Sequence, residues 1–302
     1  MGLSIVFAVL AIAVIKATPL AYAALGGVVS ENAGVVNIGL EGMMAAGAFA
    51  AVVASFYFHS VLLAVLAAAL IGAMFGLLLA YLAVTQRADQ IIVGMAINVL
   101  ALGGAAFMLS VLFGQPGASP EVTSFSTLGP AGGGTATLMT YLQRYALLWL
   151  AIILCLIVHV FLYRTPGGLH LRAVGESPHA ALTAGINVAA YRYAATIAGG
   201  VLAALGGAYL SIGEVDLYSD GMVAGRGFIA LAAVIFGRWT PLGAAGACLF
   251  FGFFSSLQIA LQRANVPAQL LEMLPYVLTI VAIAGFIGRS RPPAADGVPF
   301  TP

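Results

Sequence analysis

Charged side chains are scarce in this sequence. Of its 302 residues, 11 are Lys or Arg and 10 are Asp or Glu, so that 7% are charged, whereas a soluble domain carries about 25%. Hydrophobic residues make up 62%, and the mean hydropathy is +1.09. A water-soluble core cannot hide so much apolar surface, so the sequence predicts an all-α protein that crosses the lipid bilayer several times. The net charge of +1 gives no argument for nucleic acid, which is not expected as a partner.

Sequence motifs of catalysis are also missing. The chain has no G-x-x-x-x-G-K-[ST] phosphate loop, no H-E-x-x-H pair and no G-x-S-x-G nucleophile elbow. Its four histidines are scattered, and its two cysteines, Cys155 and Cys248, lie inside apolar runs as small buried side chains would. We therefore expect no catalytic residue, metal site or cofactor in this chain, and a membrane-embedded enzyme has little support.

Charge inside the apolar runs is rare as well. Lys16 is the main ionisable residue deep in a run, so no run carries the relay of charges that many ion-driven carriers use. An ion-coupled carrier that works alone stays open as an alternative. The sequence favours a protein whose energy comes from elsewhere.

Apolar runs mark the expected membrane segments. They are residues 3–25, 38–58, 61–84, 91–113, 146–163, 194–212, 228–236, 242–261 and 270–287. Most reach the ~20 residues that a spanning helix needs, and the shortest suits a half-helix or a broken helix. We expect about 8–10 transmembrane helices, short or broken ones included. They form one domain over residues 1–290, followed by a Pro-rich tail, 291–302, that is expected to be disordered.

The arginines predict the orientation in the membrane. If all nine runs cross, seven arginines fall on one side and three on the other. The seven are Arg87, Arg164, Arg172, Arg192, Arg238, Arg289 and Arg291, and the three are Arg144, Arg226 and Arg263. Because positive residues favour the inside, the loop at about 164–192 and the C-terminus are expected in the cytoplasm and the N-terminus outside.

The loop at about 164–192 contains the stretch GLHLRAVGESPHAALTAG. Ser177 followed by Pro178 predicts the start of a helix, because the serine can cap it and the proline is pre-set for the first turn. Gly185 can end that helix about two turns later. From these residues alone, the short helix is either a surface turn or a docking helix for a soluble partner.

Polar side chains gather at the borders of two apolar runs. Asn37 can cap the helix that follows it, and Glu41 would lie near the positive end of that helix. Gln90 stands at the entrance of the run 91–113, and Asn98 lies deeper, where its amide should face protein or water rather than lipid. These side chains either form hydrogen bonds between helices or line a polar route.

Taken together, these stretches resemble one family. The segments ENAGVVNIGLEGMMAAGAFAAV, ADQIIVGMAINVLALG, RAVGESPHAALTAGI and GRGFIALAAVIFGRWTPLGA are similar to the permease subunits of bacterial ABC importers for nucleosides, simple sugars and branched-chain amino acids. The first segment is closest to the nucleoside branch. The resemblance covers about residues 18–288 and implies a multi-pass protein of the bacterial inner membrane that moves a nucleoside by alternating access. A simple-sugar permease, for a solute such as ribose, is the alternative.

The resemblance also implies partners and site residues. Separate ATP-binding subunits would hold ATP and Mg²⁺, a second and related permease chain would complete the pore, and an extracytoplasmic binding protein would deliver the solute. The segment that couples to the ATPase would include Arg172, Gly175, Glu176, Ser177, Pro178, Ala180, Ala181 and Gly185. The substrate pathway would include Asn37, Glu41, Gln90, Asn98, Phe107 and Phe228, with the amides offering hydrogen bonds and the rings stacking on a base.

Overall fold

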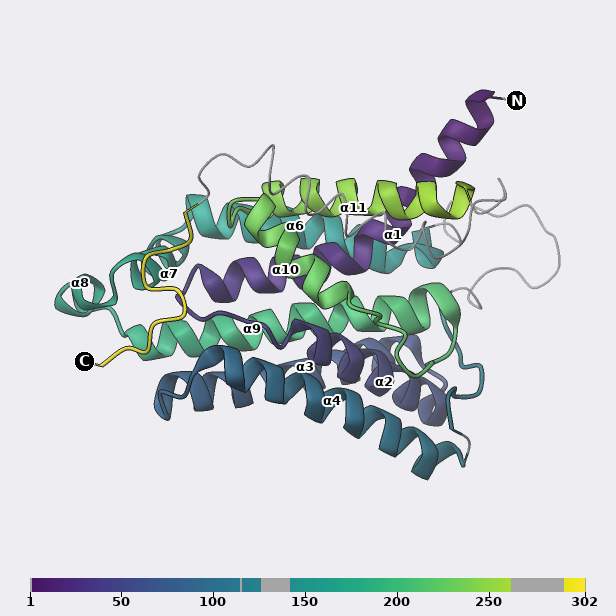
Figure 1. Cartoon of the computed structure of the whole chain (residues 1–302), viewed down its shortest axis with the longest axis horizontal. Coiled ribbons are helices and arrows are strands. Elements are labelled where there is room, and N and C mark those ends of the chain that lie inside the picture. The colour runs from purple at the N-terminus through teal and green to yellow at the C-terminus, as the bar shows by residue number, and fades with distance from the viewer. Residues whose placement is uncertain (1, 115, 126–141, 262–290, 302) are drawn as a thin grey trace.

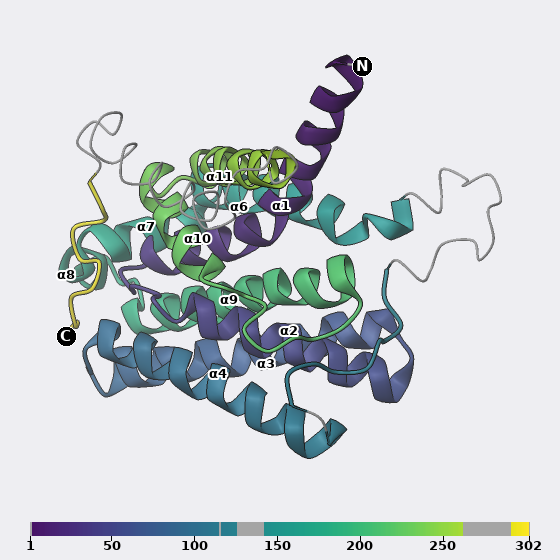
Figure 2. The ribbon, with the colours of Figure 1, turned by 45° about the vertical axis from the view of Figure 1, so that its right-hand side comes forward.

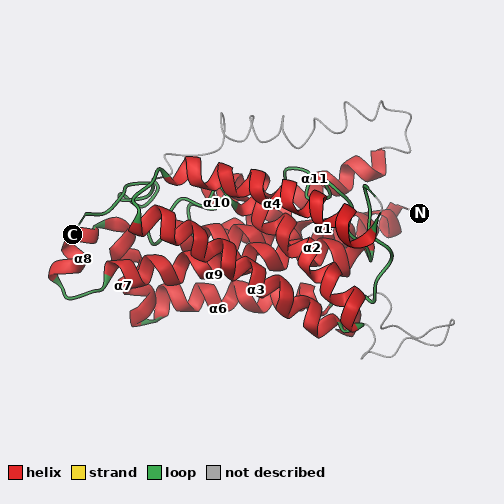
Figure 3. Cartoon of the chain, turned by 90° about the horizontal axis from the view of Figure 1, so that it is seen from below, coloured by secondary structure: helices red, strands yellow, loops and turns green. Residues whose placement is uncertain are grey.

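The computed structural model describes residues 2–114, 116–125, 142–261 and 291–301, and these residues fold into a bundle of helices (Figures 1 and 3). In chain order the helices are α1 (Gly2–Glu31), α2 (Leu40–Phe58), α3 (Val61–Ala80), α4 (Gln90–Phe113), α6 (Ala146–Arg164), α7 (Pro166–Glu176), α8 (Pro178–Thr183), α9 (Val188–Ala208), α10 (Arg226–Phe236) and α11 (Pro241–Leu261). Helices α3 and α9 continue as wider π-helical turns, η1 (Tyr81–Thr85) and η2 (Tyr209–Val215).

The apolar runs predict these helices well. Among the described residues, seven helices are long and apolar enough to cross a membrane, namely α1, α2, α3 with η1, α4, α6, α9 with η2, and α11. The short run 228–236 is the short helix α10, as the sequence predicts. The expected run at 270–287 lies outside the described residues. An all-α, multi-pass membrane protein is therefore confirmed.

Helix α9 lies at the centre of the bundle, with 83% of its most apolar window buried. It packs against α1, α2 and α3. Helices α2, α3 and α4 form one side of the bundle, and α1, α6, α10 and α11 form the other (Figures 1 and 2). The most deeply buried membrane helix thus connects the two sides.

Small residues allow the central helices to pack backbone against backbone. A Cβ atom built on Gly72 of α3 would lie 2.5 Å from the carbonyl oxygen of Gly200 in α9. One built on Gly26 of α1 would lie 2.5 Å from the carbonyl oxygen of Gly199. Close approach through small residues is a general means of joining helices in lipid, where apolar side chains gain little by leaving the bilayer.

The chain between α1 and α2 is an irregular segment, residues 32–39, which we call the α1–α2 break. It turns at Gly34, whose φ of +81° favours glycine, and then runs beside the first turns of α4. The amide nitrogen of Val36 donates to Gln90 at the start of α4, whereas the carbonyl of Ile38 accepts from Asn98, about 12 Å further along that helix. Helix α2 therefore begins about two turns beyond the start of α4.

The C-terminal tail lies against the bundle. Residues 291–301 have no helix, but they pack against the end of the bundle that carries α7 and α8 (Figure 1). Ala295 is buried, and its amide nitrogen donates to the carbonyl of Gly175 at 2.9 Å. A Pro-rich composition disfavours helix, but it leaves docking through backbone hydrogen bonds open.

Candidate functional site

Glu41 joins the starts of two helices. It lies in the first turn of α2 and is 5% exposed. Its two carboxylate oxygens accept from the amide nitrogens of Gly225 and Gly227, each at 2.7 Å, at the N-terminus of α10. A Cβ on Gly227 would lie 2.4 Å from the nitrogen of Glu41, so only glycine permits this approach. The carboxylate therefore satisfies free N–H groups at the positive end of α10 as well as lying near that of α2.

Asn98 and Gln90 attach the α1–α2 break to α4. Asn98 accepts from the amide nitrogen of Gly42 at 2.7 Å and donates to the carbonyl of Ile38 at 2.9 Å. The side-chain oxygen of Gln90 accepts from the amide nitrogen of Val36 at 2.7 Å. Both side chains are buried. Of the two interpretations that the sequence left open for Asn98, hydrogen bonding between segments is the one seen here.

The expected helix cap at Asn37 is not formed. Gly39 stands at the N-cap of α2 without a side-chain hydrogen bond, and the amide group of Asn37 lies 3.7 Å from the sulfur of Met43. The side-chain oxygen of Asn37 and the side-chain nitrogen of Gln90 are buried and have no hydrogen-bond partner among the described residues. Such atoms are costly unless another state of the protein or a ligand satisfies them.

The other end of α10 is held by residues that the sequence analysis did not select. The indole nitrogen of Trp239, just after α10, donates to a carboxylate oxygen of Glu31 at 2.5 Å. The side-chain amide of Asn32 donates to the carbonyl of Trp239 at 2.9 Å. Arg238 and Trp239 both have a positive φ, near +50°, which is unfavourable for such residues. Nothing in the spacing of these residues reveals that they meet, since 207 positions separate Asn32 from Trp239.

The two aromatic residues of the predicted pathway lie apart from the polar atoms of the break. Phe107 is 61% exposed, and it lies nine residues beyond Asn98 in α4, more than two helical turns away. Phe228 is 43% exposed and follows Gly227 at the start of α10. The structure thus brings Asn98, Gln90 and Glu41 to the break, keeps Phe228 next to it, and does not bring Phe107 there.

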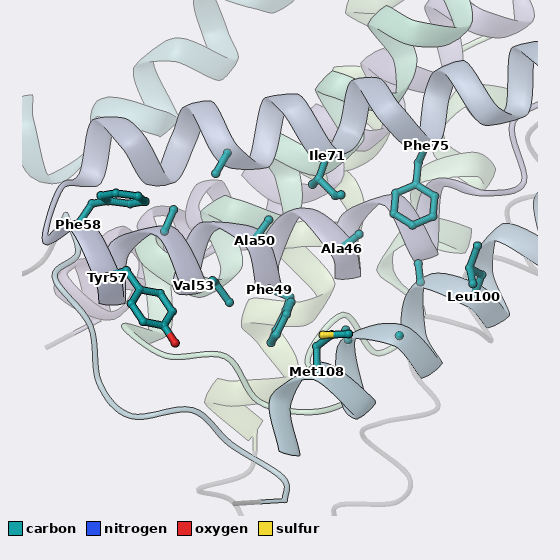
Figure 4. A pocket seen from close by; sticks show the side chains of 15 residues that line it. Ala46, Phe49, Ala50, Val53, Tyr57, Phe58, Ile71, Phe75, Leu100 and Met108 are labelled. Atoms are coloured by element: carbon teal, nitrogen blue, oxygen red, sulfur yellow. The ribbon is translucent and has the colours of Figure 1, made fainter. Parts of the chain in front are cut away.

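An apolar groove lies between α2, α3 and α4 (Figure 4). It has a volume of about 930 Å³ and contains the aromatic side chains Phe49, Tyr57, Phe58 and Phe75. None of the six predicted pathway residues lines it. The sequence does not reveal this groove, because its walls come from three helices whose alanines and aromatics are ordinary for membrane-spanning segments.

The predicted coupling segment is a pair of short helices at one end of the bundle (Figure 1). Helix α8 begins at Pro178 and ends before Gly185, whose φ is +81°, as the sequence predicts. Residues Arg172 to Glu176, just before α8, form the end of α7. The side chain of Ser177 makes no cap hydrogen bond, so that part of the prediction is wrong.

The residues of the coupling segment fall into two groups. Gly175 and Ala181 are buried, and a Cβ on Gly175 would lie 2.2 Å from the carbonyl oxygen of Asn32, so α7 packs directly on the α1–α2 break. The guanidinium of Arg172 lies 4.8 Å from the ring centre of Tyr163. Most of the others, Glu176, Ser177, Ala180 and Gly185, are exposed, and Pro178 is partly so. One face of this helix pair is thus fixed to the bundle and the other is free.

Lys16, the cation deep in the first apolar run, is paired. Its ammonium group forms a salt bridge with Glu214 in η2. A charge inside an apolar run is expensive unless a partner compensates it. Glu214 therefore compensates the charge of Lys16 inside the protein.

An all-helical bundle that combines long apolar helices with a short helix and an irregular break is typical of a membrane transporter. The chain belongs to the family of branched-chain amino acid transport system permease components, which it matches over residues 9–283. It is 44% identical to the guanosine ABC transporter permease protein NupQ of Bacillus subtilis, over 95% of this chain and 94% of that one. It is 39% identical to the nucleoside ABC transporter permease protein NupC of Lactococcus lactis, over the same shares of the two chains.

A solved structure of an inward-facing ABC transporter of metal-chelate type has a similar fold. The TM-score is 0.51 at 16% identity, and the match covers 90% of this chain and 85% of that one. This likeness concerns the fold alone.

Proposed function

We propose that this chain is the membrane-spanning permease subunit of an ATP-driven importer of nucleosides. The observation that carries the proposal is the identity of 44% and 39%, over 95% of the chain, to permeases named for guanosine and for nucleosides. The missing phosphate loop fits a division of labour in which ATP and Mg²⁺ are bound by another subunit. A second, related permease chain and an extracytoplasmic binding protein complete the proposed assembly in the bacterial inner membrane.

The exposed face of α8 is the proposed docking point for the ATP-binding subunit, and the C-terminus would then lie in the cytoplasm. Five consecutive residues, 182–186, are exposed or partly exposed, and Leu182 among them is 42% exposed. When the ATP-binding subunits close, they would displace α8 and, through Gly175, the α1–α2 break. The solute would pass by alternating access as the broken helices rearrange.

The α1–α2 break is the proposed place where the pathway residues meet the solute. Asn37 and Gln90 each have a buried polar atom with no partner in the described part of the chain, so these two amides can form hydrogen bonds with ribose hydroxyls or with a base. Glu41 and Asn98 already bind backbone groups, and their contribution would be to hold the break in shape. Phe228 lies beside them and offers a ring for stacking. Phe107 would contribute only after a rearrangement.

Uptake by a reconstituted complex tests this function. The permease, its partner permease, the ATP-binding subunit and the binding protein are placed in proteoliposomes, and entry of labelled guanosine is measured. We expect uptake that requires ATP and that unlabelled nucleosides suppress, whereas ribose at the same concentration does not. The matched control omits the ATP-binding subunit and should show no uptake.

Two results would contradict the proposal in different ways. Equal suppression by ribose would indicate a simple-sugar permease. Uptake that persists without the ATP-binding subunit and collapses with an ion gradient would indicate an ion-coupled carrier acting alone.

A further inference from the structure

Residues 291–301 form a segment that we call the C-terminal strap. It crosses the end of the bundle beside α7, α8 and the start of α9 (Figure 1, yellow). We propose that this strap is a positioning element for coupling: it holds α7 and α8 against the α1–α2 break, so that a displacement of α8 reaches the broken helices. The inference rests on the proposed function, because it concerns how ATP hydrolysis drives transport.

Three backbone segments meet at one point beneath the strap. The amide nitrogen of Ala295 donates to the carbonyl of Gly175, at the end of α7. A Cβ on Gly175 would lie 2.2 Å from the carbonyl oxygen of Asn32, and one on Gly34 would lie 3.0 Å from the carbonyl oxygen of Ala295. Helix α7, the α1–α2 break and the strap therefore touch one another through their backbones. None of the three can shift far while the other two stay in place.

The strap also compensates a buried charge at the base of α9. Arg192 is 1% exposed, and its Nη1 atom donates to the carbonyl of Val298 at 3.1 Å. Its Nε and Nη2 atoms have no hydrogen-bond partner among the described residues. Asp296 lies near enough for the guanidinium to act on its charge, although burial dominates and raises the pKa of Asp296 to about 7. A buried guanidinium without acceptors is costly, so the contacts that the strap makes with Arg192 stabilise its docked position.

Phe300 lies under α8. It belongs to a small apolar cluster with Val174, Ala181 and Val188, and Ala181 is the one residue of α8 that is fully buried. The ring centres of Phe300 and His179 are 5.1 Å apart. A helix of six residues with one buried side chain has little of its own to fix its position. Phe300 is thus one of the side chains against which α8 packs.

Variants of Phe300 distinguish a role of the strap in positioning α8 from a role in folding alone. The full complex is reconstituted, and ATP hydrolysis and solute uptake are measured in the same vesicles. For Phe300→Ala, we expect assembly and ATP hydrolysis to continue while uptake per ATP falls roughly fivefold, within the range that single contacts change coupling. Phe300→Tyr should restore most of the ratio. Val298→Ala is the matched control, because that side chain is 53% exposed and only its carbonyl contacts Arg192.

Hydrogen exchange of the unmodified complex gives a second measurement that needs no variant. The amide of Ala295 should exchange far more slowly than in a free peptide of residues 291–302, since Gly175 accepts its hydrogen bond. Exchange as fast as in the free peptide, or an unchanged uptake per ATP in Phe300→Ala, would overturn the proposal. Absence of ATP-driven uptake in the unmodified complex would instead count against the proposed function, and the exchange result would still decide whether the strap is docked.

Discussion

Two short helices, α8 and α10, are both visible in the sequence, and the structure fixes them in opposite ways. Helix α10 is held by side chains at both ends: Glu41 binds its first amide groups, while Glu31 and Asn32 bind Trp239 just beyond its last turn. In α8 no side-chain cap is formed, and Ala181 is its only fully buried residue. Helix α10 is therefore anchored within the protein, whereas α8 presents most of its surface outward.

This difference indicates which of the two helices can respond to another protein. A helix that is held at both ends by buried hydrogen bonds transmits a displacement as a unit, because bending it would leave polar groups unsatisfied. A helix with an open face can gain contacts when a partner covers it. Helix α7 packs on the α1–α2 break. Asn32 of the break binds one end of α10, and Glu41, just after the break, binds the other, so the exposed helix is connected to the anchored one through a continuous set of contacts.

Replacing Glu41 should give the largest effect on stability. Glu41→Ala removes the acceptor of two buried amide groups at the start of α10. We expect the free energy of unfolding to fall by about 2–4 kcal/mol, since each unsatisfied buried donor costs about 1–3 kcal/mol. Thermal unfolding of the purified complex in detergent measures the loss. Glu41→Gln keeps one acceptor and should lose less, whereas Glu121→Gln, in an exposed loop, should change little.

A smaller loss is expected from a methyl group at the contact between α2 and α10. In Gly227→Ala the new Cβ would lie 2.4 Å from the nitrogen of Glu41, so the two helix starts must separate. Overpacking of this kind costs about 1–3 kcal/mol. Gly103→Ala is the control within a described helix, because its Cβ would meet no atom within 4 Å. If both variants unfolded at the same temperature, the close contact at Gly227 would be refuted.

Sequence patterns predict the helices better than their contacts, and particular residues show why. Apolar length gave α4 and α11 nearly to the residue, because a membrane fixes how long a spanning helix must be. Ser177, Pro178 and Gly185 located α8 through local backbone preferences. Sequence patterns could not predict the hydrogen bond between Glu41 and Gly227, because 186 positions separate the two residues and only the folded bundle brings them together.

The polar site was predicted in part for the same reason. Depth in an apolar run indicated that Asn98 must find a partner, but whether the partner is a backbone carbonyl or a solute depends on tertiary structure. For the tail, composition reports only the tendency to form helix. The docking of Ala295 and Phe300 depends on shapes that α7 and α8 create elsewhere.

An exposed residue of α8 should behave in the opposite way to Glu41. Leu182→Asp places a charge on a side chain that is already 42% exposed, so we expect the free energy of unfolding to change by less than about 0.5 kcal/mol. Association with the ATP-binding subunit should nevertheless be lost, because the charge would be buried at the interface. Copurification from membranes measures it. Normal copurification together with normal uptake would show that α8 is not the docking point.

The smallest expected effect is a dependence of strap docking on pH. Asp296 has an ordinary pKa of 3.8, and burial in the docked strap raises the pKa to about 7 while Arg192 opposes the rise. Glu31 and Glu176 are the other charged groups that face this part of the strap. Because the docked state binds more protons between these two values, docking should weaken as the pH rises from about 4 to about 7 and then stay constant.

Hydrogen exchange at Ala295 checks this expectation once the intrinsic pH dependence of exchange has been removed. Protection should be lower at pH 7.5 than at pH 5.5 in the unmodified complex, and it should be nearly the same at the two values in Asp296→Asn, which cannot ionise. Protection that instead rises with pH would mean that the ionised carboxylate is the favoured form beside Arg192. The strap would then be held mainly by that ion pair, and the contrast between an anchored α10 and a loosely held α8 would be weaker than the contacts of the two helices indicate.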